Sequence, residues 1–180
     1  FLDLERVHME ELSAEERGAS FIEIVKGFSR DQAVKEASRC VSCGLCTATC
    51  PAHMNIPEYI DAIWKDDMSE SGRQMYKTNP LPDVCGRICT HKCETACSIG
   101  QRGEPVSIRW LKRYAMDQIP ASELATLVSQ KVVRQGGSKI AIVGGGPAGL
   151  SAAYYLALMG YKVTLYEKYQ IGRASCRERV

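Results

Sequence analysis

The sequence predicts two parts: a small, loop-rich helical domain, followed by the first βαβ unit of a Rossmann-like α/β domain. Three observations lead to this fold class. Eight of the nine cysteines fall in two short groups between residues 40 and 97. The segments around these groups have apolar residues at helical spacing. Further along, a glycine-rich turn at residues 144–149 separates a short apolar strand from a helix, and a second strand follows.

The domain boundaries follow from these changes in composition. We predict a helical domain at residues 1–119, a linker at 120–137 that ends in a glycine turn, and the start of the Rossmann-like domain at 138–170. Residues 171–180 back-translate to ATC GGA AGA GCG TCG TGT AGG GAA AGA GTG, which resembles a sequencing-adapter read. We therefore exclude this tail, with Cys176, from the fold prediction. We expect both ends to be cut and the natural chain to continue past Gln170.

Composition is that of an ordinary globular protein, with 45% hydrophobic residues, 24% charged residues and a formal net charge of +2. Such a small charge gives no basic field that would attract nucleic acid. No apolar run approaches the roughly 20 residues that span a bilayer, because glycines and a proline interrupt the longest candidate, Ile140–Gly160. We expect a soluble, cytoplasmic protein with no nucleic-acid partner and no membrane span.

Short helices are predicted on both sides of the first cysteine group. Asp31 is the expected N-cap of a helix that ends near Ser38. The segment Ile56–Thr78 reads as two short helices, with Pro57 in a first turn. Before them, four apolar residues are spaced for one face of a further helix, namely Phe21, Ile24, Val25 and Phe28.

The first cysteine group matches a ferredoxin pattern. Cys40, Cys43, Cys46 and Cys50, followed by Pro51, have the Cys-x2-Cys-x2-Cys-x3-Cys-Pro spacing of bacterial ferredoxins. Two-residue gaps let consecutive thiolates converge from a tight loop onto three corners of one cubane cluster. In two-cluster ferredoxins the fourth cysteine binds the other cluster. The spacing therefore predicts iron-sulfur ligands.

The second group, Cys85, Cys89, Cys93 and Cys97, repeats every four residues. On a continuous helix each step of four advances about 400°, so the side chains drift by about 40° per step. One helix cannot direct all four at one centre. Either the helix breaks, or the ligands are divided between two clusters. Eight cysteines make two sets of four, which predicts two 4Fe-4S clusters.

Other interpretations of the cysteines remain open. A disulfide framework is typical of small secreted chains, but no secretion signal is seen. Zinc is the stronger rival, although zinc ribbons usually pair two Cys-x2-Cys knuckles and lack a four-cysteine run that ends in proline. His53 and His91 are expected to be surface residues or neighbours of the ligands, because enough cysteines are available.

At this point the sequence resembles a known family. The stretches Glu36-Ala-Ser-Arg-Cys40, Asn79-Pro-Leu-Pro, Cys85-Gly-Arg-Ile-Cys89 and Cys93-Glu-Thr-Ala-Cys97 resemble the N-terminal iron-sulfur domain of glutamate synthase small subunits, NADPH-ferredoxin oxidoreductases and dihydropyrimidine dehydrogenase. The resemblance covers residues 20–170.

The resemblance implies how the ligands are divided. One cluster is expected on Cys40, Cys43, Cys46 and Cys97, and the other on Cys50, Cys89 and Cys93. Some relatives supply the remaining ligand from a downstream Glu or Gln, which aligns with Lys112. An ammonium cannot serve, so Cys85 is our candidate for this position.

The glycine turn has the features of a dinucleotide-binding loop. Gly144-Gly145-Gly146-Pro147-Ala148-Gly149 satisfies G-x-G-x-x-G between the predicted strand Lys139–Val143 and a helix at about Ala148–Met159. Gly160 is expected to end that helix in a left-handed conformation. Glu167, with Lys168 beside it, follows the second strand, Lys162–Tyr166, and is expected to accept hydrogen bonds from ribose. The loop resembles the FAD site of the family.

These observations predict the electron-transfer part of an NAD(P)H-dependent oxidoreductase with FAD and two 4Fe-4S clusters. The resemblance implies that the NAD(P)H site lies outside this chain and that a partner subunit or domain exchanges electrons with the clusters. No side chain is a convincing catalytic acid, base or nucleophile, so none is nominated. The alternatives are a ferredoxin-like carrier with a nucleotide-binding segment, and a zinc-stabilised interaction module.

Overall fold

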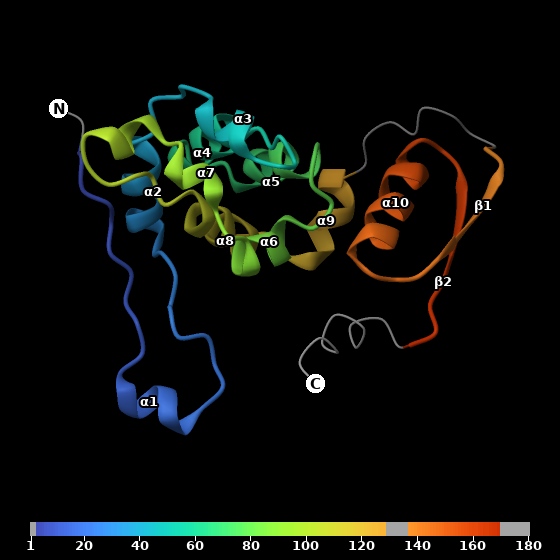
Figure 1. The fold of residues 1–180 in the computed structure, drawn as a ribbon, viewed down its shortest axis with the longest axis horizontal. Helices are drawn as coiled ribbons and strands as arrows, with labels where there is room; N and C mark the ends of the chain where they lie inside the picture. The colour runs from blue at the N-terminus through green and yellow to red at the C-terminus, as the bar shows by residue number, and fades with distance from the viewer. Residues whose placement is uncertain (1–2, 129–136, 170–180) are drawn as a thin grey trace. The chain divides into compact units, whose positions relative to one another are not determined.

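The computed structural model describes residues 3–128 and 137–169 (Figure 1). It divides into two compact units, Phe1–Leu124 and Ala125–Val180, and each is described by itself. The adapter-like tail at 171–180 lies outside the described residues, as do Gln135 and Gly136 of the predicted turn.

The first unit is helical, as predicted (Figure 1). In it α4 packs against α2, α5 and α8, while α6 packs against α8. The elements from the N-terminus are α1 (Ala14–Ala19), α2 (Arg30–Ser38), α3 (Leu45–Thr49), α4 (Ile56–Trp64), α5 (Met68–Tyr76), α6 (Pro82–Ile88), α7 (Lys92–Thr95), the 3-10 turn η1 (Ser98–Gln101) and α8 (Ile108–Gln118). The next helix, α9 (Ala121–Val128), includes the boundary between the two units.

The core of this unit is built around α4. Tyr59, Ile60 and Ile63 on this helix are at most 1% exposed, as are Met75 on α5 and Leu111 on α8. Burial of side chains of this size stabilises a fold by roughly 1.5–3 kcal/mol each. The prediction of two helices in residues 56–78 is confirmed, and so is the proline in the first turn of α4. The core therefore places α4 beside the cysteine loop that precedes it.

The predicted helix on Phe21, Ile24, Val25 and Phe28 is wrong. These residues lie in a non-helical arm that carries α1 at its tip (Figure 1). Two backbone bonds of 2.9 Å explain why, since the Leu12 amide donates to the Ile24 carbonyl and the Lys26 amide donates to the Glu10 carbonyl. This antiparallel pairing requires extended backbone, and helical backbone cannot provide it.

The start of α2 also differs from the prediction. Its N-cap is Ser29, two residues before Asp31. The Ser29 hydroxyl accepts the Gln32 amide at 3.3 Å, and the Gln32 side-chain oxygen accepts the Ser29 amide at 2.8 Å. This reciprocal capping box satisfies two helix-end donors, whereas Asp31 lies within the first turn.

The second unit contains the predicted βαβ arrangement. β1 (Lys139–Val143) pairs in parallel with β2 (Lys162–Tyr166), and α10 (Pro147–Leu158) connects them. The register runs from Lys139 opposite Lys162 to Val143 opposite Tyr166. Gly160 has a φ of 87°, as predicted for a left-handed helix end. The predicted linker contains a helix that the sequence analysis missed, α9.

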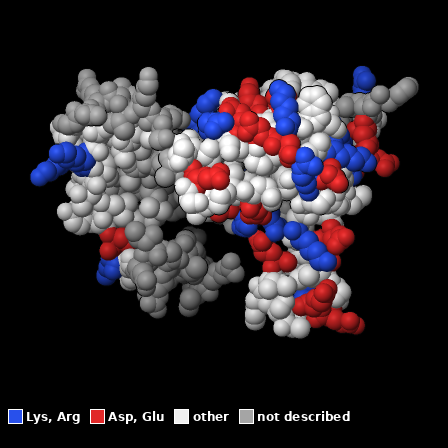
Figure 2. Space-filling view, turned by 180° about the vertical axis from the view of Figure 1, so that it is seen from behind, with Lys and Arg blue, Asp and Glu red and all other residues white. Residues whose placement is uncertain are grey.

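No helix in the described ranges combines the length and apolar character that a membrane crossing requires. Figure 2 shows acidic and basic side chains intermixed over the visible face of the helical unit, in keeping with the small net charge.

Candidate iron-sulfur and nucleotide sites

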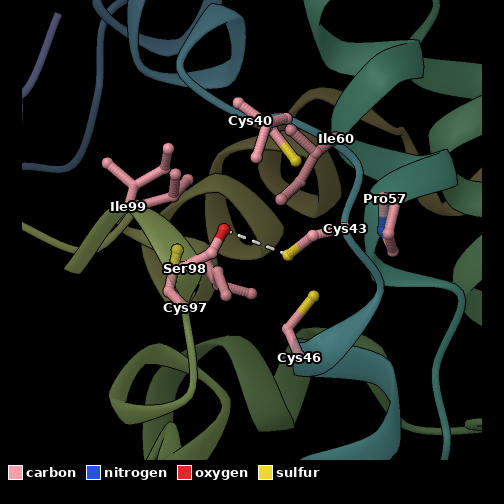
Figure 3. A pocket seen from close by; sticks show the side chains of 11 residues that line it. Cys40, Cys43, Cys46, Pro57, Ile60, Cys97, Ser98 and Ile99 are labelled. Atoms are coloured by element: carbon pink, nitrogen blue, oxygen red, sulfur yellow. Dashed lines mark hydrogen bonds between the residues drawn. The ribbon is translucent and has the colours of Figure 1, made fainter. Parts of the chain in front are cut away.

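Four cysteines from two distant stretches of chain line one pocket (Figure 3). Cys40, Cys43 and Cys46 come from the loop before α3 and from α3 itself, and Cys97 comes from the end of the second cysteine group. The rest of the wall is largely apolar and includes Val41, Pro57, Ile60, Ile99, Val106 and Ile108. An apolar wall with four convergent thiols suits a 4Fe-4S cluster, whose iron atoms bind cysteine thiolates.

The backbone of the first cysteine loop explains this convergence. Gly44 has a φ of 77°, and Ser42 has a φ of 53°. These left-handed conformations turn the chain tightly between ligands, and glycine adopts one without steric cost. The helix α3 then begins at Leu45, which places Cys46 in its first turn with the side chain buried.

The four thiols of this pocket differ in their electrostatics. Burial raises the pKa of Cys40, and the neighbouring Cys97 and Cys43 add to the effect. Burial, with Cys40 nearby, raises the pKa of Cys46 to about 11. Cys43 is exposed, and the Ser98 hydroxyl lowers its pKa by hydrogen bonding. Mutual effects among these thiols indicate that their sulfurs face a common space.

The second set of thiols gathers where α6 ends. Cys89 is the residue after α6, and the chain turns at His91 with a φ of 43° before α7 carries Cys93. The helix therefore breaks between the cysteines. Burial raises the pKa of Cys93 to about 12, and Glu94, Cys50 and Cys89 contribute in the same direction, while Lys112 opposes them. The thiols of Cys50 and Cys89 thus lie near enough to Cys93 to act on its pKa.

Lys112 lies on α8 and is only 6% exposed. Its ammonium lies near the Cys93 thiol and lowers the pKa of that thiol, against the effect of burial. Cys85 lies one turn before Cys89 on α6 and is half-buried. Residues four apart share a helix face, so Cys85 is on the Cys89 side of α6.

A buried hydroxyl supports the fit of inorganic clusters between these helices. Tyr59 is completely buried, and its hydroxyl has no hydrogen-bond partner among the described residues. Burial raises its pKa well above the usual range, and the thiols of Cys93, Cys46 and Cys50 add to this. An unpaired buried donor costs about 1–3 kcal/mol. Sulfide or thiolate sulfur of a bound cluster would give this hydroxyl an acceptor.

A buried ion pair lies directly before the first cysteine loop in the chain. Glu36 and Arg39, at the end of α2, have side chains that are 0% and 1% exposed, and they pair at 2.7 Å. Glu36 also accepts the amides of Val7 at 2.7 Å and Ser107 at 2.8 Å. Because Cys40 follows Arg39 directly, this pair fixes where the cysteine loop begins.

Glu94 is a second buried carboxylate that holds neighbouring segments by hydrogen bonds, here beside Cys93. Its side chain is 7% exposed and accepts the Arg109 amide at 3.1 Å and the Arg6 guanidinium at 3.4 Å. Arg109 in turn donates to the Cys89 carbonyl at 3.2 Å. His91 faces the Glu94 carboxylate, with 3.6 Å between Nδ1 and Oε2, and His53 is exposed.

The glycine loop of the second unit leaves room for a phosphate group. Gly144 has a φ of 105°, and added Cβ atoms at Gly144 and Gly146 would meet nothing within 4 Å. Pro147 opens α10, and Ala148 follows it in the first turn. The amides at this helix start carry the partial positive charge that attracts pyrophosphate.

Close packing at the end of this loop requires glycine. A Cβ at Gly149 would overlap the Gly144 carbonyl oxygen and lie 3.1 Å from its carbon. The Glu167 carboxylate accepts the Gly145 amide at 2.6 Å and the Tyr169 amide at 2.9 Å, and these bonds lower its pKa. Glu167 therefore stands charged beside the loop. The Lys168 ammonium lies 5.5 Å from the Tyr169 ring centre.

Comparison with known proteins agrees with this geometry. The family model described as dihydropyrimidine dehydrogenase domain II, 4Fe-4S cluster, matches residues 17–124. The chain belongs to this family. A second model, FAD dependent oxidoreductase, matches residues 139–178. The predicted order of an iron-sulfur domain and an FAD-binding domain is therefore confirmed.

The curated relatives of this 4Fe-4S family member include a glutamate synthase chain and an oxidoreductase subunit. The glutamate synthase [NADPH] small chain of Escherichia coli is 35% identical over 173 residues, which is 94% of this chain and 36% of that protein. The NADPH-Fe(3+) oxidoreductase subunit beta of Geobacter sulfurreducens is 47% identical over 122 residues, or 68% of this chain and 18% of that protein.

A third relative is the NADP(+)-dependent formate dehydrogenase subunit beta of Moorella thermoacetica, 40% identical over 141 residues, or 68% of this chain and 20% of that protein. The chain thus spans about a third or less of the length of these relatives.

Proposed function

We propose that this chain is the electron-entry part of an NAD(P)H-dependent oxidoreductase with FAD and two 4Fe-4S clusters. The observation that carries the proposal is the single pocket lined by Cys40, Cys43, Cys46 and Cys97, which joins two stretches more than 40 residues apart. The relatives named as NADPH-dependent support it. When bound, FAD supplies hydride chemistry with NAD(P)H and the clusters supply one-electron chemistry.

The residues of this chain have distinct tasks in that function. Cys40, Cys43, Cys46 and Cys97 hold the first cluster, and Cys50, Cys89 and Cys93 hold the second, with Cys85 as its fourth ligand. The apolar wall of the first pocket limits the access of water to the first cluster, and cluster burial and nearby charge set the potentials of both clusters.

In the second unit the loop residues Gly144, Gly145, Gly146, Pro147, Ala148 and Gly149 hold the pyrophosphate of FAD. Glu167 orients its ribose, with Lys168 at the edge of the site. The NAD(P)H site lies outside this chain, and the electron partner is another subunit or domain. The expected compartment is the cytoplasm.

Two alternative functions compete with this proposal, a zinc-stabilised module and a ferredoxin-like carrier. A zinc module needs thiolates on one metal ion, with sulfurs within about 4 Å of one another. Among the described residues no group of three or more His, Cys, Asp or Glu side chains is placed to hold one metal ion. A cubane spreads its four thiolates over four irons, so they stand further apart. A ferredoxin-like carrier would share the clusters but would not exchange electrons with FAD.

Ligand substitutions test the assignment. After anaerobic reconstitution, iron and acid-labile sulfide analysis of the unsubstituted chain should give about eight of each. Cys97→Ser should give about four of each, because it removes a ligand of the first cluster only. Cys85→Ser should also lose iron, but from the second cluster. Full iron content in Cys97→Ser contradicts the ligand set, and one or two zinc ions without sulfide support the zinc module.

A functional readout separates the flavoenzyme from the carrier. In a longer protein that carries this chain with its following domains, NADPH should reduce the clusters under anaerobic conditions, as seen by bleaching of their visible absorbance. Removal of FAD should abolish this reduction. Cluster reduction that proceeds without FAD supports the carrier.

A further inference from the structure

The side chain of Ser98, which is outside the ligand set, contacts a ligand sulfur. The Ser98 hydroxyl donates a hydrogen bond to the Cys43 sulfur at 3.2 Å (Figure 3). Ser98 begins η1 and directly follows Cys97, so adjacent residues bring one ligand and one hydrogen bond to the same pocket. The contact joins the two cysteine groups across 55 positions of sequence.

This contact acts on the exposed member of the set. Cys43 is exposed, whereas Cys46 and Cys97 are buried. The Ser98 hydroxyl is a side-chain donor that reaches this sulfur. A hydrogen bond from a hydroxyl favours the negatively charged form of its acceptor.

Cluster chemistry gives this bond a consequence. A thiolate is only an acceptor, so the hydroxyl must act as the donor when iron is bound. One-electron reduction adds a negative charge that spreads over the cluster and its thiolates, and a hydrogen bond to a charged acceptor strengthens as that charge grows. The bond therefore stabilises the reduced state more than the oxidised state, which raises the reduction potential.

We propose that Ser98 is a positioning residue that raises the reduction potential of the cluster held by Cys40, Cys43, Cys46 and Cys97, through its hydrogen bond to Cys43. The inference deepens the proposed function and rests on it. The second set of thiols has a different environment. There the His91 amide donates to the Cys89 sulfur at 3.3 Å, and buried Lys112 lies near Cys93. Removal of the Ser98 hydroxyl therefore changes one cluster and spares the other.

The test compares three variants in the reconstituted chain. Ser98→Ala removes the hydroxyl, and Ser98→Thr retains it. Ser38→Ala removes an exposed hydroxyl whose partner is the Lys35 carbonyl of its own helix, so it is the matched control. Electron paramagnetic resonance at set potentials measures the reduced fraction of each cluster.

In Ser98→Ala the ratio of reduced to oxidised first cluster should fall about tenfold at a fixed potential, which is a 59 mV shift for one electron. Ser98→Thr should restore most of that ratio, and Ser38→Ala should leave both clusters unchanged. Lys112→Met should shift the reduction potential of the second cluster, which shows which paramagnetic resonance signal belongs to which cluster.

Iron and sulfide are counted first in each preparation, so that the two proposals fail separately. A wild-type chain that binds no iron refutes the proposed function. A fully loaded Ser98→Ala chain with unchanged potentials refutes the role of Ser98, as does an equal shift of both clusters. If Ser98→Ala does not bind its clusters, resonance Raman spectra of the wild-type and Ser98→Thr chains provide the test. The iron-thiolate bands of both chains should shift when H2O is replaced by D2O. Bands that do not shift in either chain overturn the inference.

Discussion

The buried pair at the end of α2 gives the sharpest prediction. Glu36→Ala removes a carboxylate that accepts the guanidinium of Arg39 and the amides of Val7 and Ser107. Arg39 then stays buried, and its remaining hydrogen-bond acceptors include the carbonyl oxygens of Asp3 and Leu4. The N-terminal segment and the loop before α8 both lose their anchor on α2.

The magnitude follows from burial. Removal of one partner from a fully buried ion pair costs about 3–5 kcal/mol, which is a large part of the roughly 5–15 kcal/mol that holds a domain together. At about 1.4 kcal/mol per tenfold, local opening should become roughly 100- to 4,000-fold more frequent. The first cysteine loop, which begins at Cys40, opens with it.

Native-state hydrogen exchange measures this opening directly. In the reconstituted Glu36→Ala chain, peptides that contain Val7 and Ser107 should lose protection by at least about 100-fold. Peptides from residues 139–166 belong to the other compact unit and serve as an internal control. Glu58→Ala, which removes an exposed carboxylate on α4, is the matched variant. A change below tenfold at Val7 and Ser107, or an equal change in the control peptides, refutes this reasoning.

Two further predictions concern the glycine loop and the buried thiols. Gly149→Ala forces a Cβ against the Gly144 carbonyl and should destabilise the βαβ unit by about 1–3 kcal/mol, which speeds amide exchange at residues 139–166. Gly18→Ala is the control, because an added Cβ there meets nothing within 4 Å and should not weaken the fold. Equal exchange at residues 139–166 in both variants contradicts the close approach of Gly149 to Gly144. The second prediction is that the metal-free chain loses stability as pH rises above about 9. In the folded chain the pKa values of Cys46 and Cys93 are about 11 and about 12, above the ordinary value of 9.0. The folded state therefore holds protons that the unfolded state releases, so a rise in pH favours unfolding. Urea midpoints from tryptophan fluorescence at pH 8 and pH 10 check this, and a midpoint that does not fall argues against buried neutral thiols.

Features with a short-range cause were predictable from the sequence. The strand limits Lys139–Val143 and Lys162–Tyr166 follow from short apolar runs beside glycines, and both are confirmed. The left-handed Gly160 follows from the need to end a helix tightly. The two-residue cysteine gaps predicted a tight loop, and the structure turns the chain at Ser42 and Gly44.

Features that depend on distant partners were not predictable. Phe21 and Ile24 fit a helix face, but the backbone around Ile24 pairs with residues 10–12, and this contact overrides the local pattern. From the sequence we named Asp31 as the N-cap and missed Ser29, although the Gln32 three residues after Ser29 is the sequence signal of a capping box. The Ser98 hydrogen bond spans 55 positions of sequence, and Ser98 was not singled out from the sequence.

The buried pair shows the same limit. Arg39 precedes Cys40 in a polar stretch, and sequence alone favours a solvated side chain there. Its burial depends on carbonyl groups from Asp3, Leu4 and Glu104, which only the folded chain brings together. From the sequence Tyr59 is an ordinary core aromatic residue. The structure adds that its hydroxyl has no hydrogen-bond partner among the described residues and lies near thiols of both cysteine sets.

Native mass spectrometry of the anaerobically reconstituted chain tests the central claim most directly, because it weighs the protein together with what it holds. Thiolates that converge as in Figure 3, with a second set around Cys93, predict a mass increase equal to two Fe4S4 units. A mass that matches the bare polypeptide, or the polypeptide with zinc, contradicts the account.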